Sequence, residues 1–232
     1  MKYFGTVAGE QHKYLNKIIR DETKIDEAKE VFLDIHSKMH LSKVTNTSKN
    51  DVDTLLEDLS DEEYRALVYY DHETIIWCLW HLARIEDCTM NILVNQGTQI
   101  FDDTWKSKMN VSITDTGNAL SEDEMMYLSK EINIKNCIKY RNQVAKQTQK
   151  IIKGLTAKDM IRKVEKKDLM KVKEVGGVTE DKDSIWLLDY WGSKDIAGLL
   201  LMPPTRHAIL HLNDCCKWKD HMRNGKKVYR HE

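Results

Sequence analysis

The chain has 232 residues, of which 41% are hydrophobic and 31% charged, a mixture typical of a folded globular protein. Its 36 basic and 37 acidic side chains nearly balance, which argues against a surface built for nucleic acid. The strictly apolar runs reach about six or seven residues, too few to cross a bilayer, and the N-terminus turns polar too early for a signal peptide. Five cysteines without a C-x-x-C motif indicate reduced thiols in the cytoplasm.

Two prolines and ten glycines in the whole chain favour long helices over strands and tight turns. Capping signals and helical periodicity predict, in chain order, helices over 8–20, 23–41, a short one after Ser60, 74–94, one from Ser121 that breaks and resumes over 134–155, 196–202, and 203–222. Residues 42–50 and 98–120 are predicted connections, and "VGGV" at 175–178 either joins two short strands or is a loop. Four substantial helices with long connections predict a single all-α domain, a helical bundle over residues 1–232.

Two histidines stand at an i, i+4 spacing in the last predicted helix, within "TRHAILHLNDCC". His207 and His211 therefore lie on one side of that helix and can share one metal ion. His81, in the apolar stretch "IIWCLWHLARIED", supplies a third imidazole if the two helices face each other. The alternative for His81 is a core histidine bonded to a backbone carbonyl, and a spaced pair also occurs by chance on surfaces.

A second i, i+4 pair, His36 and His40, lies in "HSKMH" beside an apolar helical stripe. Three interpretations stay open for it: direct metal ligands, polar residues in the wall of a ligand pocket, or ordinary surface or core histidines. A di-iron centre of the ferritin kind needs Glu-x-x-His motifs, and this chain has none. A phosphate-binding loop, a serine nucleophile elbow and an H-E-x-x-H motif are absent from the sequence too.

Three motifs together resemble the DinB superfamily. "ETIIWCLWHLARIEDCTMNIL" is similar to that family's second-helix motif, W-H-x-A-R-x-E-D, and "PPTRHAILHLND" to the H-x-x-x-H of its last helix. "LSDEEYRALVYYD" matches the usual lead-in, so the resemblance covers roughly residues 24–222. Two departures are the sequence after His211, which lacks the common H-x-G-Q continuation, and the long connection over 156–202.

The resemblance implies a four-helix bundle of up-down-down-up type that binds one divalent metal ion, commonly zinc, nickel or iron. Carried over residue by residue, the ligands it implies are His81, His207 and His211. Characterised relatives include enzymes in which a low-molecular-weight thiol such as bacillithiol or mycothiol is activated at the metal. The resemblance therefore implies a metal-dependent thiol S-transferase, with a metal-dependent hydrolase and a non-catalytic metal- or small-molecule-binding bundle as alternatives.

A catalytic metal needs an open coordination position and a cavity leading to it. We expect a small-molecule pocket walled by Trp77, by Tyr190 and Trp191, which could form a lid, and by His36 and His40. Asp214, three residues past His211, is the acid expected to orient a ligand imidazole. No further catalytic residue is assigned, no nucleic-acid or membrane partner is expected, and the sequence leaves open whether the chain forms a homodimer.

Overall fold

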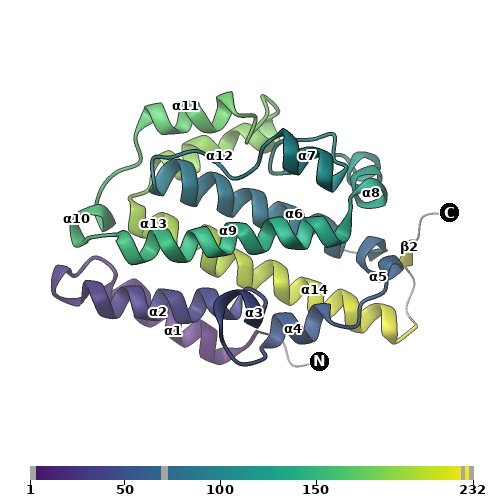
Figure 1. Cartoon of the computed structure of the whole chain (residues 1–232), viewed down its shortest axis with the longest axis horizontal. Helices are drawn as coiled ribbons and strands as arrows, with labels where there is room; N and C mark the ends of the chain where they lie inside the picture. The colour runs from purple at the N-terminus through teal and green to yellow at the C-terminus, as the bar shows by residue number, and fades with distance from the viewer. Residues whose placement is uncertain (1–3, 69–72, 226–227, 230–232) are drawn as a thin grey trace.

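The computed structural model describes residues 4–68, 73–225 and 228–229, and almost all of its regular structure is helical (Figure 1). Of the segments labelled η, η1 is a 3-10 turn, whereas η2 and η3 are π-helical. The elements are α1 Thr6–Ile18, η1 Glu22–Lys24, α2 Ile25–Lys38, α3 Ser42–Thr45, α4 Asp51–Leu56, α5 Asp61–Arg65, β1 Leu67–Val68, α6 Ile75–Glu86, η2 Asp87–Val94, α7 Asp103–Met109, α8 Glu122–Glu131, α9 Ile134–Gly154, α10 Ala157–Met160, α11 Lys166–Glu174, α12 Lys182–Gly192, α13 Ile196–Leu200, η3 Met202–His207, α14 Ala208–Arg223 and β2 Val228–Tyr229. The two short strands pair antiparallel.

Side-chain caps start several helices where the sequence predicts them. Ser60 and Ser121 each form a capping box with the glutamate three residues later, which confirms the predicted starts of α5 and α8. The Thr74 hydroxyl accepts a hydrogen bond from the backbone N–H of Trp77 and so fixes the start of α6. The predicted cap at Thr23 was wrong, because the carboxylate of Asp21 accepts from the Thr23 N–H and starts η1 instead.

The predicted long helix over 74–94 is present, but its backbone hydrogen bonds change register at Asp87. It runs as α6 to Glu86 and continues as π-helical η2 to Val94, and every residue from Ile75 to Val94 is buried. The helix predicted from Pro203 likewise begins with a π segment, η3, before α14. π-helical turns are uncommon and often lie at functional sites, so both helices that carry the candidate histidines have an irregular turn next to them.

Helix α6 lies at the centre of the packing, against both α9 and α14, while α2 contacts α9 and η3 (Figure 1). Large side chains such as Trp80 and Tyr140 fill the core between α6 and α9, and Phe32 of α2 belongs to a second apolar cluster with η2. Because α6 has buried neighbours on all sides, a polar side chain on it must find its partner inside the protein. This places every titratable group of α6 next to another helix or a connection.

The region over 156–192 forms helices α10, α11 and α12, and "VGGV" at 175–178 is a turn rather than a strand pair. Gly176 has φ +69°, a left-handed conformation that glycine adopts without strain. A Cβ on Gly177 would lie 2.8 Å from Cys88 Sγ, so the second glycine allows the turn to approach η2 closely. Within the described part of the chain, no helix combines the length and apolarity needed to span a membrane.

Candidate metal site

The imidazole of His81 is buried in the middle of α6 and oriented by a backbone carbonyl. Its Nδ1 lies 2.8 Å from the carbonyl oxygen of Thr116, and the residue is 2% exposed. Since a carbonyl only accepts, Nδ1 carries the proton and Nε2 presents its lone pair to the opposite side. Trp77, one turn earlier, stacks on the ring with centroids 4.8 Å apart and planes 9° apart, which fixes the ring plane.

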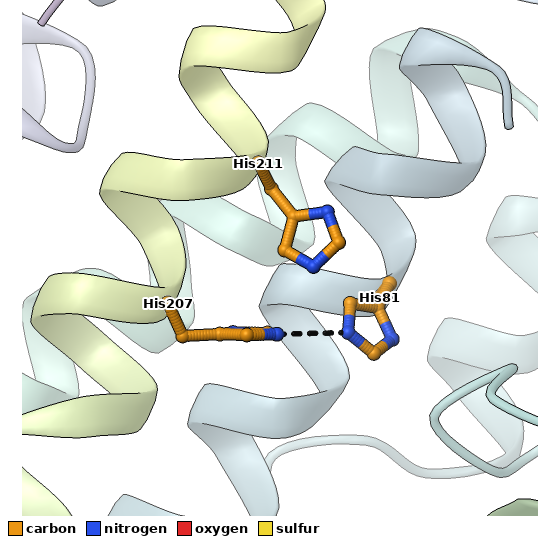
Figure 2. A group of neighbouring side chains, drawn as sticks. All are labelled: His81, His207 and His211. Atoms are coloured by element: carbon orange, nitrogen blue, oxygen red, sulfur yellow. Dashed lines mark hydrogen bonds between the residues drawn. The ribbon is translucent and has the colours of Figure 1, made fainter. Parts of the chain in front are cut away.

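His207, the last residue of η3, and His211, on α14, point at His81 from the facing helix (Figure 2). The Nε2 atoms of His81 and His207 are 3.1 Å apart, and the ring centroids lie 4.6–5.0 Å from one another. One ring nitrogen from each residue falls within a set whose members are all within 4.8 Å of one another. The structure thus brings together the three histidines that the sequence singled out, in an arrangement that one ion could share.

Burial keeps two of these imidazoles in the neutral form that a metal ion requires. It lowers the pKa of His81 to about 3, assisted by the charge of His211, and it lowers the pKa of His207 well below its usual value. Burial also lowers the pKa of His211, but Cys78 and Glu73 act against it and the balance is a pKa raised to about 10.

Cys78 and Glu73 do not contribute equally to His211 at neutral pH. Burial raises the pKa of the Cys78 thiol well above its usual value, so that thiol is protonated and its sulfur carries no charge. The charge that raises the pKa of His211 at neutral pH is therefore that of the Glu73 carboxylate, whose Oε2 lies 3.7 Å from Nδ1 of His211. That separation is longer than a hydrogen bond, and Nδ1 has no hydrogen-bond partner among the described residues.

Two further residues of the second-helix motif hold the connection that orients His81. Arg84 donates from Nε to the carbonyl of Thr114 at 2.9 Å, and Asp87 accepts from the backbone N–H groups of Ile100 and Phe101. The hydroxyl of Tyr140 donates to Asp87 at 2.6 Å and joins α9 to the same network. Sequence reasoning did not assign these roles to Arg84 and Asp87, although both stand in the motif with His81.

A cavity of about 600 Å³ lies beside the three rings, and His81, His207 and His211 are part of its lining. Trp77, Tyr190 and Trp191 line it as well, where the sequence placed the pocket wall. The last two come from the end of α12. Gly117 reaches the same wall with φ +77°, and a Cβ there would lie 3.0 Å from Nε1 of Trp77, so the close approach of this connection depends on glycine.

Two predicted contributions to the site lie elsewhere. His36, on α2, and His40, two residues beyond its end, are fully buried and face Glu86 at the end of α6 and not the cavity. The carboxylate of Asp214 is half-exposed and pairs with Lys217 one turn later on α14, so it does not take the orienting role predicted for it. The Thr116 carbonyl takes that role for His81, while Nδ1 of His211 makes no hydrogen bond.

Comparison with known proteins supports the family that the motifs suggest. The sequence model of the DinB superfamily matches residues 45–179, more than half of the chain. No curated protein matches the sequence. The matched segment includes His81 together with Arg84, Glu86 and Asp87, whereas His207 and His211 lie beyond its end. The chain belongs to the DinB superfamily.

Proposed function

We propose that this protein is a metal-dependent enzyme in which His81, His207 and His211 hold one divalent ion, and that its chemistry is transfer of a low-molecular-weight thiol. The single observation that carries the proposal is the convergence of three imidazoles at the wall of a cavity of about 600 Å³. Structural metal sites are closed, while catalytic ones leave a coordination position open towards a cavity. The up-down-down-up four-helix bundle and a cytoplasmic location belong to the same proposal.

The donor set fits a borderline metal such as zinc, nickel or iron(II), because imidazole suits all three. An ion held here would supply a positive centre that lowers the pKa of a bound thiol or water. In thiol transfer the sulfur forms a bond to an electrophilic carbon of the acceptor, and the leaving group departs with the electron pair of its own bond. The thiol proton passes to solvent or to the leaving group.

The chain's own residues prepare the site for such a reaction. Thr116 keeps the proton of His81 on Nδ1, so Nε2 faces the cavity side. Trp77 covers one face of His81 and keeps water from that side of the ring. Asn118 and Ser121 contribute polar groups to the same cavity, where they can bind a substrate and orient it.

The test compares His207→Ala with His221→Ala, a histidine further along the same helix and outside the cavity lining. Metal content, helical circular dichroism and turnover of an electrophilic acceptor are measured with and without added thiol. Thiol-dependent turnover and one bound ion that are both lost in His207→Ala, with His221→Ala unchanged, support the proposal.

The two alternatives give other results in the same measurements. Turnover that needs the metal but no thiol points to a hydrolase, and a full metal site without any turnover points to a binding protein. Activity that survives in metal-free His207→Ala protein would overturn the proposal altogether.

A further inference from the structure

A second group of metal-ligating side chains lies in the core between α2 and α6, away from the cavity. It consists of His36 on α2, His40 two residues beyond the end of that helix, and Glu86 at the end of α6, and we refer to these three residues as the sealed cluster. His36 and His40 are 0% exposed and Glu86 is 4% exposed. Their ring and carboxylate atoms can be chosen so that all lie within 4.8 Å of one another.

Each carboxylate oxygen of Glu86 faces one imidazole of the sealed cluster. Nε2 of His36 lies 2.9 Å from Oε1, and Nε2 of His40 lies 3.2 Å from Oε2. Such separations are those of neighbouring ligands bonded to one first-row ion about 2.1 Å from each, at an angle of about 90–100°. With both carboxylate oxygens and both Nε2 atoms, the cluster offers four donors from three residues.

The sealed cluster leaves ring nitrogens unsatisfied in the core. Neither nitrogen of His40 makes a hydrogen bond, since its contact with Glu86 lacks hydrogen-bond geometry, and Nδ1 of His36 is without a partner too. Buried polar groups are rarely left in that condition, because an unmade hydrogen bond in the core is costly. An occupant bound between the two rings and Glu86 would satisfy Nε2 of His40.

A second residue fixes the orientation of the carboxylate. The hydroxyl of Thr148 on α9 donates to Oε1 of Glu86 at 2.6 Å, so α9 holds the group that α6 supplies. Carboxylate ligands are commonly held in this way by hydrogen bonds from neighbouring side chains. All three side chains of the sealed cluster are buried, and none of them lines the cavity of about 600 Å³.

We propose that His36, His40 and Glu86 bind a second divalent transition-metal ion, with a structural role, that ties α2 to α6. Imidazole with carboxylate suits zinc or iron(II). The burial of all three side chains fits a closed site rather than a catalytic one.

A proton shared by His36 and Glu86 is the alternative to an ion in the sealed cluster. A proton between His36 and Glu86 satisfies only that pair and leaves His40 unpartnered. The metal ion engages all three residues, which is why we favour it over the proton.

The experiment counts metal ions in the full-length chain, produced without an affinity tag in zinc-supplemented medium so that a closed site can fill as the protein folds. We expect about two ions per chain in the wild type and about one in His207→Ala, which removes a ligand of the cavity site and leaves the sealed cluster intact. Glu86→Gln keeps the shape of the side chain and removes its charge, and it should also retain about one ion. The double variant should bind none.

His207→Ala tests the proposed second metal site even if Glu86→Gln fails to fold, because His36, His40 and Glu86 are unchanged in His207→Ala. An ion retained in His207→Ala supports the proposal, and cobalt substituted for it should give the absorption of a nitrogen- and oxygen-coordinated site. A His207→Ala protein that folds by circular dichroism and contains no metal overturns it. A Glu86→Gln protein with as many ions as the wild type overturns it as well.

Discussion

The two histidine clusters of this protein are built alike and placed differently. Each takes two histidines four residues apart, His207 of η3 with His211 of α14 or His36 of α2 with His40 just beyond it, and one residue from α6. The first borders a cavity of about 600 Å³, whereas the second is enclosed by packed helices. The comparison teaches that the spacing creates a ligand set, but that access from a cavity decides whether the set can meet a substrate.

Helix α6 serves both clusters because its two residues point in different directions. His81 and Glu86 are five positions apart, which corresponds to a rotation of about 140° around a helix of 3.6 residues per turn. His81 therefore turns towards η3 and α14, and Glu86 turns towards α2 and α9, where the Thr148 hydroxyl donates to it. Because α6 is buried on all faces, both directions lead to another element of the protein.

The largest expected effect separates the clusters by activity. His81→Ala removes a ligand whose orientation depends on Thr116, and we expect thiol-dependent turnover to fall roughly 1000-fold or more, about 4 kcal/mol of transition-state stabilisation. Steady-state kinetics of the metal-loaded protein check this, with His221→Ala as the control on α14. A loss of less than about tenfold would mean that the cavity cluster, formed by His81, His207 and His211, is not the catalytic centre.

The next largest effect is a difference in the free energy of unfolding between variants of two carboxylates, Glu86 in the sealed cluster and Glu73 beside His211. Glu86→Gln removes the charge of a core carboxylate that lies against both imidazoles, and such losses cost about 3–5 kcal/mol. Glu73→Gln, at a side chain that is 30% exposed, should change the free energy of unfolding by less than about 1 kcal/mol. Urea unfolding of both variants measures the difference, and equal destabilisation would show that the two carboxylates have equivalent surroundings.

Chelation should distinguish the clusters by rate. We expect an ion in the cavity site to leave quickly and an ion in the sealed cluster to leave only when the helices open. Metal release followed with a coloured chelator should therefore have a fast and a slow phase, and His207→Ala should lack the fast one. The melting temperature should fall by roughly 5–10 °C, since a ligand at about 100 times its Kd contributes about 2.7 kcal/mol.

Helical circular dichroism at room temperature should persist through chelation, because a chain of this size has a substantial apolar core of its own. Unfolding on chelation, as small zinc modules show, would mean that metal binding and folding are coupled here. A single release phase in the wild type would remove the kinetic difference between the clusters.

Local signals in the sequence were sufficient for some of these features and not for others. The capping boxes at Ser60 and Ser121 and the spacing of His207 and His211 act within one helix, so the sequence could predict them. The partner of His36 and His40 depends on which face of α6 meets α2, which only the packed structure determines. The group that orients His81 is a backbone carbonyl, and since every residue has one, no side-chain pattern could point to Thr116.

The smallest effect concerns the charge of the thiol that the cavity cluster would accept. The described lining of the cavity contains Glu73 and Glu122 and includes no lysine or arginine. A carboxylate carried by the thiol would be repelled by about 1–1.5 kcal/mol at a separation of about 6 Å and an effective dielectric constant of about 40. We therefore expect KM to be roughly tenfold higher for 3-mercaptopropionate than for 2-mercaptoethanol, with cysteamine lowest of the three.

Glu122→Gln should reduce the differences in KM among the three thiols without changing the metal content. Added salt should reduce these differences further, since screening weakens interactions between accessible charges. The bond between sulfur and metal is common to these thiols, and the charge of the ion is common to the wild type and Glu122→Gln, so the change between the two proteins isolates the contribution of the glutamate. A lowest KM for 3-mercaptopropionate would mean that the ion, or a basic residue outside the described lining, attracts the carboxylate more than the glutamates repel it. In that case the glutamates of the cavity would not determine which thiol is preferred.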